Sequence, residues 1–289
     1  MFPGSAGKLT LSLDQTYLEA RENADPKFEE QRGSLNLPIW DGVDSSLAMI
    51  LRGQRTSFGQ RVYFPEKGVE LPEEFGAADI GLAWSRETLS GDQLSASATY
   101  GHAGTKLLDN GHSAIVSANF FYEDRGPTSS CLYFVNYSNN RPYLNNIPIP
   151  GVAYMSRGKS HTWIFGLPFI FLSWRPSLFS LTTSISPFGA LIEPAFRIYG
   201  PLQIFGNLSW SPRSYQGVVK HGDDRLIADK KEVGGGLRMS FSKDASLSLG
   251  YIYAFDRRLL VARSLTDDAA ESINVRDSGG FQIKGRLSY

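Results

Sequence analysis

The stretch SGGFQIKGRLSY (residues 278–289), with which the chain ends, carries apolar side chains at alternate positions. Phe281, Ile283 and Leu287 share one parity, and polar side chains fill most of the other. In a β-strand the two parities lie on opposite faces of the sheet. The stretch therefore predicts a strand over 280–289 with one apolar face and one polar face.

The same period of two recurs along the chain, for example in AADIGLAWS (77–85), EVGGGLRMSFS (232–242) and ASLSLGYIYAF (245–255). In these windows a helical period describes the apolar positions less well than a period of two, so the pattern predicts an all-β protein. We expect fourteen strands, with twelve as the alternative because the strand at 30–39 is short and contains Pro38. The expected strands are 8–20, 30–39, 45–56, 76–87, 92–102, 112–124, 130–139, 161–174, 177–186, 190–199, 201–211, 232–242, 246–257 and 280–289.

Composition excludes several classes of protein. The 289 residues carry 29 Lys and Arg against 29 Asp and Glu, and this balance argues against a nucleic-acid binder. No apolar run reaches the about 18 residues of a membrane helix. The single cysteine, Cys131, cannot form an internal disulfide. Because MFPGSAGKLT (1–10) lacks the regions of a signal peptide, we expect an exported protein in its processed form.

Short turns and long polar segments alternate between the expected strands, apart from the brief SPFG (186–189). The long segments are 21–29, 57–75, 103–111, 140–160, 212–231 and 258–279. The polar parity is rich in Ser, Gly and Thr, whereas the solvent face of a sandwich would be rich in Lys and Glu. Many Trp and Tyr residues fall near strand ends, as they do at membrane interfaces. We therefore predict a closed, antiparallel, up-and-down transmembrane β-barrel that forms a single domain over 1–289.

The terminal strand FQIKGRLSY (281–289) resembles the signature by which bacterial outer-membrane β-barrels are recognised by their assembly machinery. The stretches GLPFIFLSWRPS (166–177) and FGALIEPAFRI (188–198) are similar to poorly characterised families of that superfamily. The resemblance implies an outer-membrane location, contact with membrane lipids and lipopolysaccharide, and engagement of the assembly machinery by the strand ending at Tyr289. We also expect the first and last strands to pair and both chain ends to lie in the periplasm.

Charged residues on the inward parity are the candidate pore lining. They are Arg52, Asp79, Glu123, Glu193, Arg197, Arg238, Asp256, Lys284 and Arg286, with Asp14 beside them. Glu193 and Arg197 share a strand and a face, which predicts an ion-pair network across the lumen. Arg238, Lys284 and Arg286 fall on nearby strands, and their charge would favour anions locally.

Segment 140–160 is the candidate interaction surface, because it exposes apolar residues in a Pro- and Asn-rich loop. Those residues are Tyr143, Leu144, Ile147 and Ile149. The sequence offers little chemistry besides: the four histidines, His102, His112, His161 and His221, are expected at the long-loop end without neighbouring metal ligands. GxSxG is absent from the sequence. We expect no catalytic residues, no metal and no cofactor.

Three functions are compatible with these patterns. The first is a passive or weakly selective pore for small hydrophilic solutes, which acts through lumen charges. The second is a non-conducting barrel that anchors or joins a larger envelope complex with protein partners. The third is a rim-sited hydrolase, which would need His102 or His112 close to a Ser or Asp.

Overall fold

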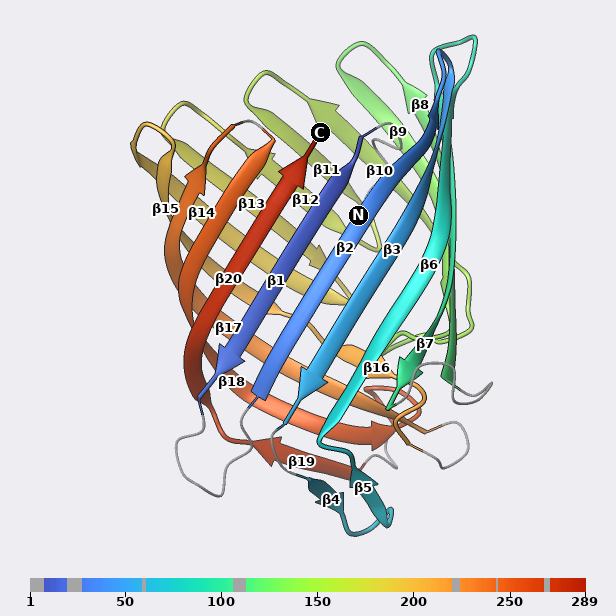
Figure 1. Cartoon of the computed structure of the whole chain (residues 1–289). Coiled ribbons are helices and arrows are strands. Elements are labelled where there is room, and N and C mark those ends of the chain that lie inside the picture. The colour runs from blue at the N-terminus through green and yellow to red at the C-terminus, as the bar shows by residue number, and fades with distance from the viewer. Residues whose placement is uncertain are drawn as a thin grey trace.

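The fold is given by a computed structural model, which describes residues 8–19, 28–58, 61–105, 113–219, 224–242, 244–267 and 271–289. Within these residues sixteen antiparallel strands form one closed barrel (Figure 1). In chain order they are β1 (Thr10–Leu18), β2 (Phe28–Asp41), β3 (Ser45–Ser57), β6 (Glu74–Glu87), β7 (Gln93–Gly104), β8 (Ala114–Arg125), β9 (Ser129–Ser138), β10 (Ile149–Arg157), β11 (His161–Leu167), β12 (Ile170–Trp174), β13 (Phe179–Ser186), β14 (Gly189–Tyr199), β15 (Leu202–Trp210), β17 (Arg225–Ser240), β18 (Ala245–Ala262) and β20 (Ser278–Ser288). Four short strands lie outside the ring: β4 (Val62–Phe64), β5 (Val69–Leu71), β16 (Arg213–Tyr215) and β19 (Glu271–Val275).

The first and last strands close the barrel. β1 pairs with β20 in antiparallel register, from Thr10 opposite Ser288 to Leu18 opposite Gly280. Closure leaves no unpaired backbone edge, which a sheet in hydrocarbon requires. The predicted closed antiparallel barrel and the predicted pairing of its two ends are therefore confirmed.

The predicted strand number of fourteen is wrong, because the structure has sixteen. β10 lies inside 140–160, which we expected to be a loop. The expected strand 161–174 is two strands, β11 and β12, joined by a tight turn at Leu167 and Pro168. Both errors concern the same part of the wall, where the inward side chains are apolar as well as the outward ones.

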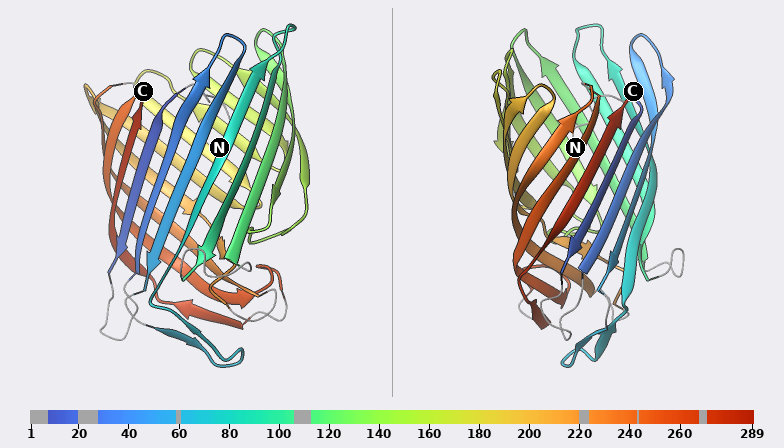
Figure 2. Two further views of the ribbon diagram at one scale, coloured as in Figure 1. Left: turned by 45° about the vertical axis from the view of Figure 1, so that its right-hand side comes forward. Right: turned by 60° about the vertical axis from the view of Figure 1, so that its left-hand side comes forward.

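The barrel has a short-turn end and a long-loop end (Figures 1 and 2). β1 begins and β20 ends at the short-turn end, at the top of Figure 1. The wall has unequal height at the other end: β11, β12 and β13 have 7, 5 and 8 residues, whereas β17 and β18 have 16 and 18. The extra length of β17 and β18 curves over the long-loop end, where β16 and β19 pair with it.

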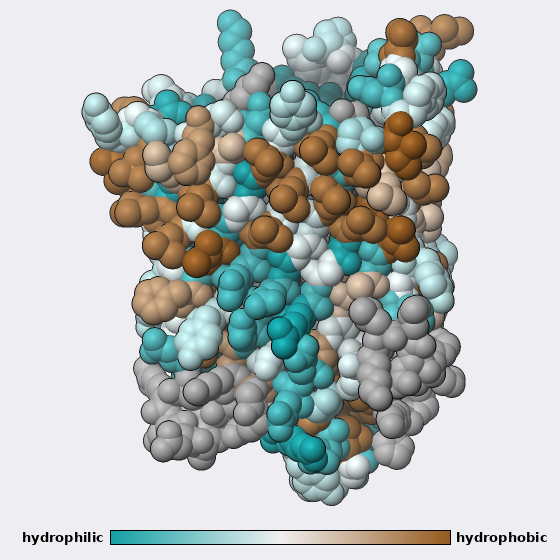
Figure 3. Space-filling model, in the orientation of Figure 1, coloured by the Kyte–Doolittle hydropathy of each residue, from teal (hydrophilic) through white to brown (hydrophobic). Residues whose placement is uncertain are grey.

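An apolar belt crosses the short-turn half of the face shown in Figure 3, and large apolar side chains are exposed on the other strands of the wall as well. Its outward side chains are large and exposed, as at Leu13 (57%), Phe165 (62%) and Leu249 (56%). Beyond the belt the outer face turns polar, as at Arg55 and Glu74, whose exposed side chains pair with each other. Exposed apolar area of this extent is what a lipid-embedded barrel presents, so the chain is a membrane barrel of the outer-membrane type.

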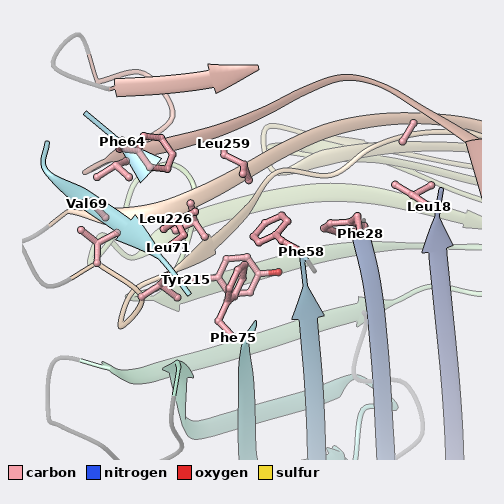
Figure 4. Packing of buried hydrophobic residues seen from close by; sticks show 14 of the residues in the cluster. Leu18, Phe28, Phe58, Phe64, Val69, Leu71, Phe75, Tyr215, Leu226 and Leu259 are labelled. Atoms are coloured by element: carbon pink, nitrogen blue, oxygen red, sulfur yellow. The ribbon is translucent and has the colours of Figure 1, made fainter. Parts of the chain in front are cut away.

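A hydrophobic core fills the long-loop end of the lumen (Figure 4). We call it the mouth core. It contains Leu18, Phe28, Phe58, Phe64, Val69, Leu71, Phe75, Tyr215, Val218, Val219, Leu226, Ile252, Ala254, Leu259 and Val261. Its members come from strand ends, from the β4–β5 hairpin and from residues near β16, so this entrance is packed with side chains. Among the described residues, no helix is long and apolar enough to cross a membrane.

Candidate functional site

One ion pair of the lumen joins β14 to β17. Arg238 Nη2 lies 2.8 Å from Glu193 Oε1, and Arg238 Nε donates to Ser248 Oγ at 3.0 Å. The guanidinium also lies 4.8 Å from the ring centroid of Phe205, whose own strand separates β14 from β17. Glu193 thus pairs with Arg238 across one intervening strand, and its predicted partner Arg197, on the same strand, forms no ion pair among the described residues.

Two weaker ion pairs each join neighbouring strands of the barrel, β3 with β6 and β1 with β20. Arg52 Nε is 3.5 Å from Asp79 Oδ1, and Lys284 Nζ is 3.9 Å from Asp14 Oδ2. Gln282 also donates to Asp14, at 3.2 Å. These side chains follow the strand register, in which Arg52 faces Asp79 and Asp14 faces Lys284.

Glu123 joins several side chains at the short-turn end of the barrel. Its carboxylate lies 2.7 Å from Arg157 Nη2 and 3.4 Å from Arg125 Nε, and it accepts a hydrogen bond from Ser130. Only 7% of Glu123 is exposed. Its charge is therefore neutralised within the wall, and we expect it to contribute little to the potential that a solute meets.

Arg197 and Arg286 are the least compensated cations of the lumen parity. Both side chains are exposed, and neither makes an ion pair with another described residue. Asp256, by contrast, does not join the lumen set. It lies at a bulge with φ of 46°, is almost half exposed and pairs with Lys231, which has the outward parity. The bulge breaks the alternation that placed Asp256 inside.

The strongest polar cluster of the lumen is not among the residues predicted from the sequence. Glu30, only 2% exposed, accepts hydrogen bonds from Gln54 Nε2 at 2.7 Å and Arg32 Nε at 3.0 Å. Arg213 Nη1 and Lys230 Nζ lie 2.7 and 3.0 Å from the same carboxylate. The inward parity of the predicted strand 30–39 includes residues 30 and 32, but only the fold shows that 213 and 230 meet them.

A small cavity of about 20 Å³ lies beside this cluster, with Glu30, Arg213, Lys230 and Arg257 in its lining. That is room for about one water molecule. Lys230 and Arg257 both approach the Phe28 ring, at 5.1 and 5.2 Å from its centroid. The cluster is thus a packed polar layer against the mouth core.

The segment 211–219, which we call the strap, carries Arg213 to this cluster. β16 within it pairs with β17, and Tyr215 packs edge-on against Phe75 with ring centroids 4.7 Å apart (Figure 4). Burial raises the pKa of the Tyr215 hydroxyl, which therefore stays protonated and bonds Gln54 and Thr56. Farther along, Gly217 N donates to Ala103 O at 2.9 Å.

The loop between β9 and β10 holds the predicted interaction residues. Leu144 and Ile147 are about half exposed, whereas Tyr143 is partly buried and Ile149 has the inward parity of β10. Leu144 has φ of 51°. The loop contacts the segment that follows β18, because Leu265 N donates to Pro142 O at 2.8 Å.

Within the described residues, neither His102 nor His161 belongs to a catalytic site that solvent can reach. His102 Nδ1 lies 2.9 Å from Ser113 Oγ, but these residues are 7% and 2% exposed. His161 begins β11 at the short-turn end, and not at the long-loop end as predicted, because β10 reverses the chain first. His112 and His221 lie outside the described residues. Among the residues described, no group of three His, Cys, Asp or Glu could hold a metal ion.

Known proteins provide a fold comparison only. No protein-family model matches the chain, and no curated protein does. Among solved structures, the CymD monoaromatic hydrocarbon channel shares 10% identity at a TM-score of 0.46, over 98% of this chain and 88% of that one. OccK10 of Pseudomonas aeruginosa shares 10% at 0.45, over 98% of both chains. The β domain of the Bordetella autotransporter BrkA shares 12% at 0.36, over 98% of this chain and 99% of that one. These likenesses do not bear on a solute.

Proposed function

We propose that the protein is an outer-membrane channel for small hydrophilic solutes, with a preference for anions. The observation that carries the proposal is the division of the wall: outward side chains are apolar over the belt, while charged and hydroxyl side chains face inward. A barrel of eight strands is filled by its own side chains, and the diameter of a barrel grows with the number of strands. A ring of sixteen strands therefore has room for an aqueous path.

The proposed selectivity rests on the lumen charges of the short-turn half. Arg52, Arg238 and Lys284 each have an acidic neighbour, which leaves Arg197 and Arg286 as uncompensated positive charge among the described residues. At about 7 Å in a water-like medium, one charge changes the energy of a monovalent ion by about 0.6 kcal/mol. That energy is about a threefold change in local concentration, before salt screens it.

The test is a reversal-potential measurement in a planar bilayer under a KCl gradient. The wild type should prefer chloride, and the double variant Arg197→Gln, Arg286→Gln should lower the anion-to-cation permeability ratio by about threefold or more. Arg55→Gln is the matched control, because Arg55 faces outward and pairs with Glu74. Cation preference in the wild type, or an unchanged ratio in the double variant, would refute the proposed selectivity.

A second candidate is the non-conducting barrel, an anchor within an envelope complex. The mouth core favours it, because fifteen buried side chains fill the long-loop end. Exposed Leu144 and Ile147 would then contact a protein partner. Silent bilayers despite verified insertion would support this function over the channel. In either case we propose that the assembly machinery engages β20, whose outward face presents Phe281, Ile283 and Leu287.

A further inference from the structure

The strap crosses the lumen at the long-loop end. It leaves the wall at Trp210 on β15, pairs with β17 through β16, and reaches β7 through an isolated bridge between Gly104 and Gly217. From β17 the ring runs through β18, β20, β1, β2, β3 and β6 to β7. The strap therefore joins walls that lie almost half-way round the barrel from each other.

Two kinds of contact anchor the strap to the far wall. The polar anchor is Arg213 on Glu30, with the Tyr215 hydroxyl bonded to Gln54 and Thr56. The second is close backbone contact at Gly217, where an added Cβ would lie 2.3 Å from Ala103 O and 2.4 Å from Ser113 Cβ. No side chain larger than hydrogen fits there without moving backbone or a β-carbon.

The barrel wall does not need the strap. β15 pairs directly with β17 from Leu202 opposite Met239 to Trp210 opposite Lys231, and this ladder ends where the strap begins. β16, the part of the strap that pairs with β17, is only 3 residues long. The strap can therefore leave its anchors while the ring stays closed, which separates opening of the entrance from unfolding of the barrel.

We propose that the strap is the gate of the channel: docked, it closes the long-loop entrance, and released, it opens it. This inference rests on the proposed channel function. Tyr215, 3% exposed, and Val218 and Val219, both 6% exposed, are the strap residues that pack into the mouth core, so release withdraws their side chains from the entrance. The Arg213–Glu30 pair holds the strap in the docked position.

The test uses the full refolded chain and two variants that attack different anchors. Gly217→Val disrupts the glycine contact. Arg213→Ala with Tyr215→Phe removes the polar anchor and keeps the Tyr215 ring in the mouth core. Gly285→Val is the matched control, because a Cβ at Gly285 meets nothing within 4 Å. Heat-modifiable migration on gels shows that each variant keeps its barrel. Hydrogen–deuterium exchange over 211–219 then reports docking, and single-channel conductance reports opening.

The gate predicts that exchange over 211–219 rises by about tenfold or more in both test variants, with longer or larger openings, and that Gly285→Val matches the wild type. Faster exchange with wild-type conductance overturns the gate and leaves the channel standing. A wild-type protein that conducts fully while residues 211–219 are protected from exchange also overturns the gate and leaves the channel standing. If exchange over 211–219 is unchanged in both variants, these contacts do not hold the strap in place, and the gate is refuted as well. If exchange shows that the strap is released and yet neither the wild type nor any variant conducts, the proposed channel function is itself wrong.

Discussion

Replacing Glu30 with glutamine should destabilise the barrel by about 3–5 kcal/mol, the usual cost of removing one partner from a buried ion pair. Glu30 Oε1 and Oε2 are the acceptors for Arg213 and Lys230 at 2.7 and 3.0 Å, and Arg32 binds the same carboxylate. Lys230 keeps Glu232 at 2.7 Å after the change. Arg213 has no other ion pair among the described residues and is left as uncompensated charge beside the mouth core. Arg32 also loses its ion pair, although its side chain is one-third exposed and still interacts with the charge of Asp14.

The assay is urea unfolding in phospholipid bilayers, followed by tryptophan fluorescence. Glu70→Gln on the β4–β5 hairpin is the control, because its pair with Arg61 is more than half exposed and should be worth about 0.5 kcal/mol or less. Adding Arg213→Met to Glu30→Gln should restore about 1 kcal/mol or more, since it removes one of the stranded cations. A loss below about 1 kcal/mol for Glu30→Gln, or a second substitution that only adds damage, would refute the reasoning.

Two predictions concern the wall itself. Ile283→Arg places a charge on the lipid face and should cost about 2–4 kcal/mol in the same unfolding assay, whereas Lys284→Arg, one residue along on the lumen face, should change stability by less than about 0.5 kcal/mol. Equal effects at the two positions would contradict the assigned parity. Gly151→Val should cost about 1–3 kcal/mol, because its Cβ would lie 1.8 Å from the Phe134 ring, which packs between Phe121 and Phe169. An unchanged urea midpoint would show that the Phe134 ring is not fixed between Phe121 and Phe169.

The apolar inner wall explains where the sequence pattern mispredicts the strands. On β9 to β12 the inward positions carry Leu132, Phe134, Met155, Ile164 and Phe171, and the outward positions are apolar too. With both faces apolar, the period of two disappears from the sequence. The pattern therefore predicts a loop over 149–157, and it predicts one continuous strand through the turn at Leu167 and Pro168.

Elsewhere the alternation predicted the barrel well. The closed ring, the pairing of β1 with β20 and the short-turn rhythm all follow from local patterns, because each strand shows its own two faces within about ten residues. The same parity assigned both Arg238 and Glu193 to the lumen, although it named Arg197 as the partner of Glu193. It also included Asp256, because a bulge leaves no mark in the alternation.

Outside β9 to β12 and the bulge at Asp256, the amino-acid sequence by itself determined which side chains face lipid and which face the lumen, since that choice depends on a period of two within each strand. Only the tertiary structure decided what fills the lumen. Arg213 meets Glu30 from 183 positions away in the chain, and Gly217 meets Ala103 across the barrel. Such contacts depend on how far around the ring a loop can reach, and no local pattern of apolar and polar residues encodes that distance.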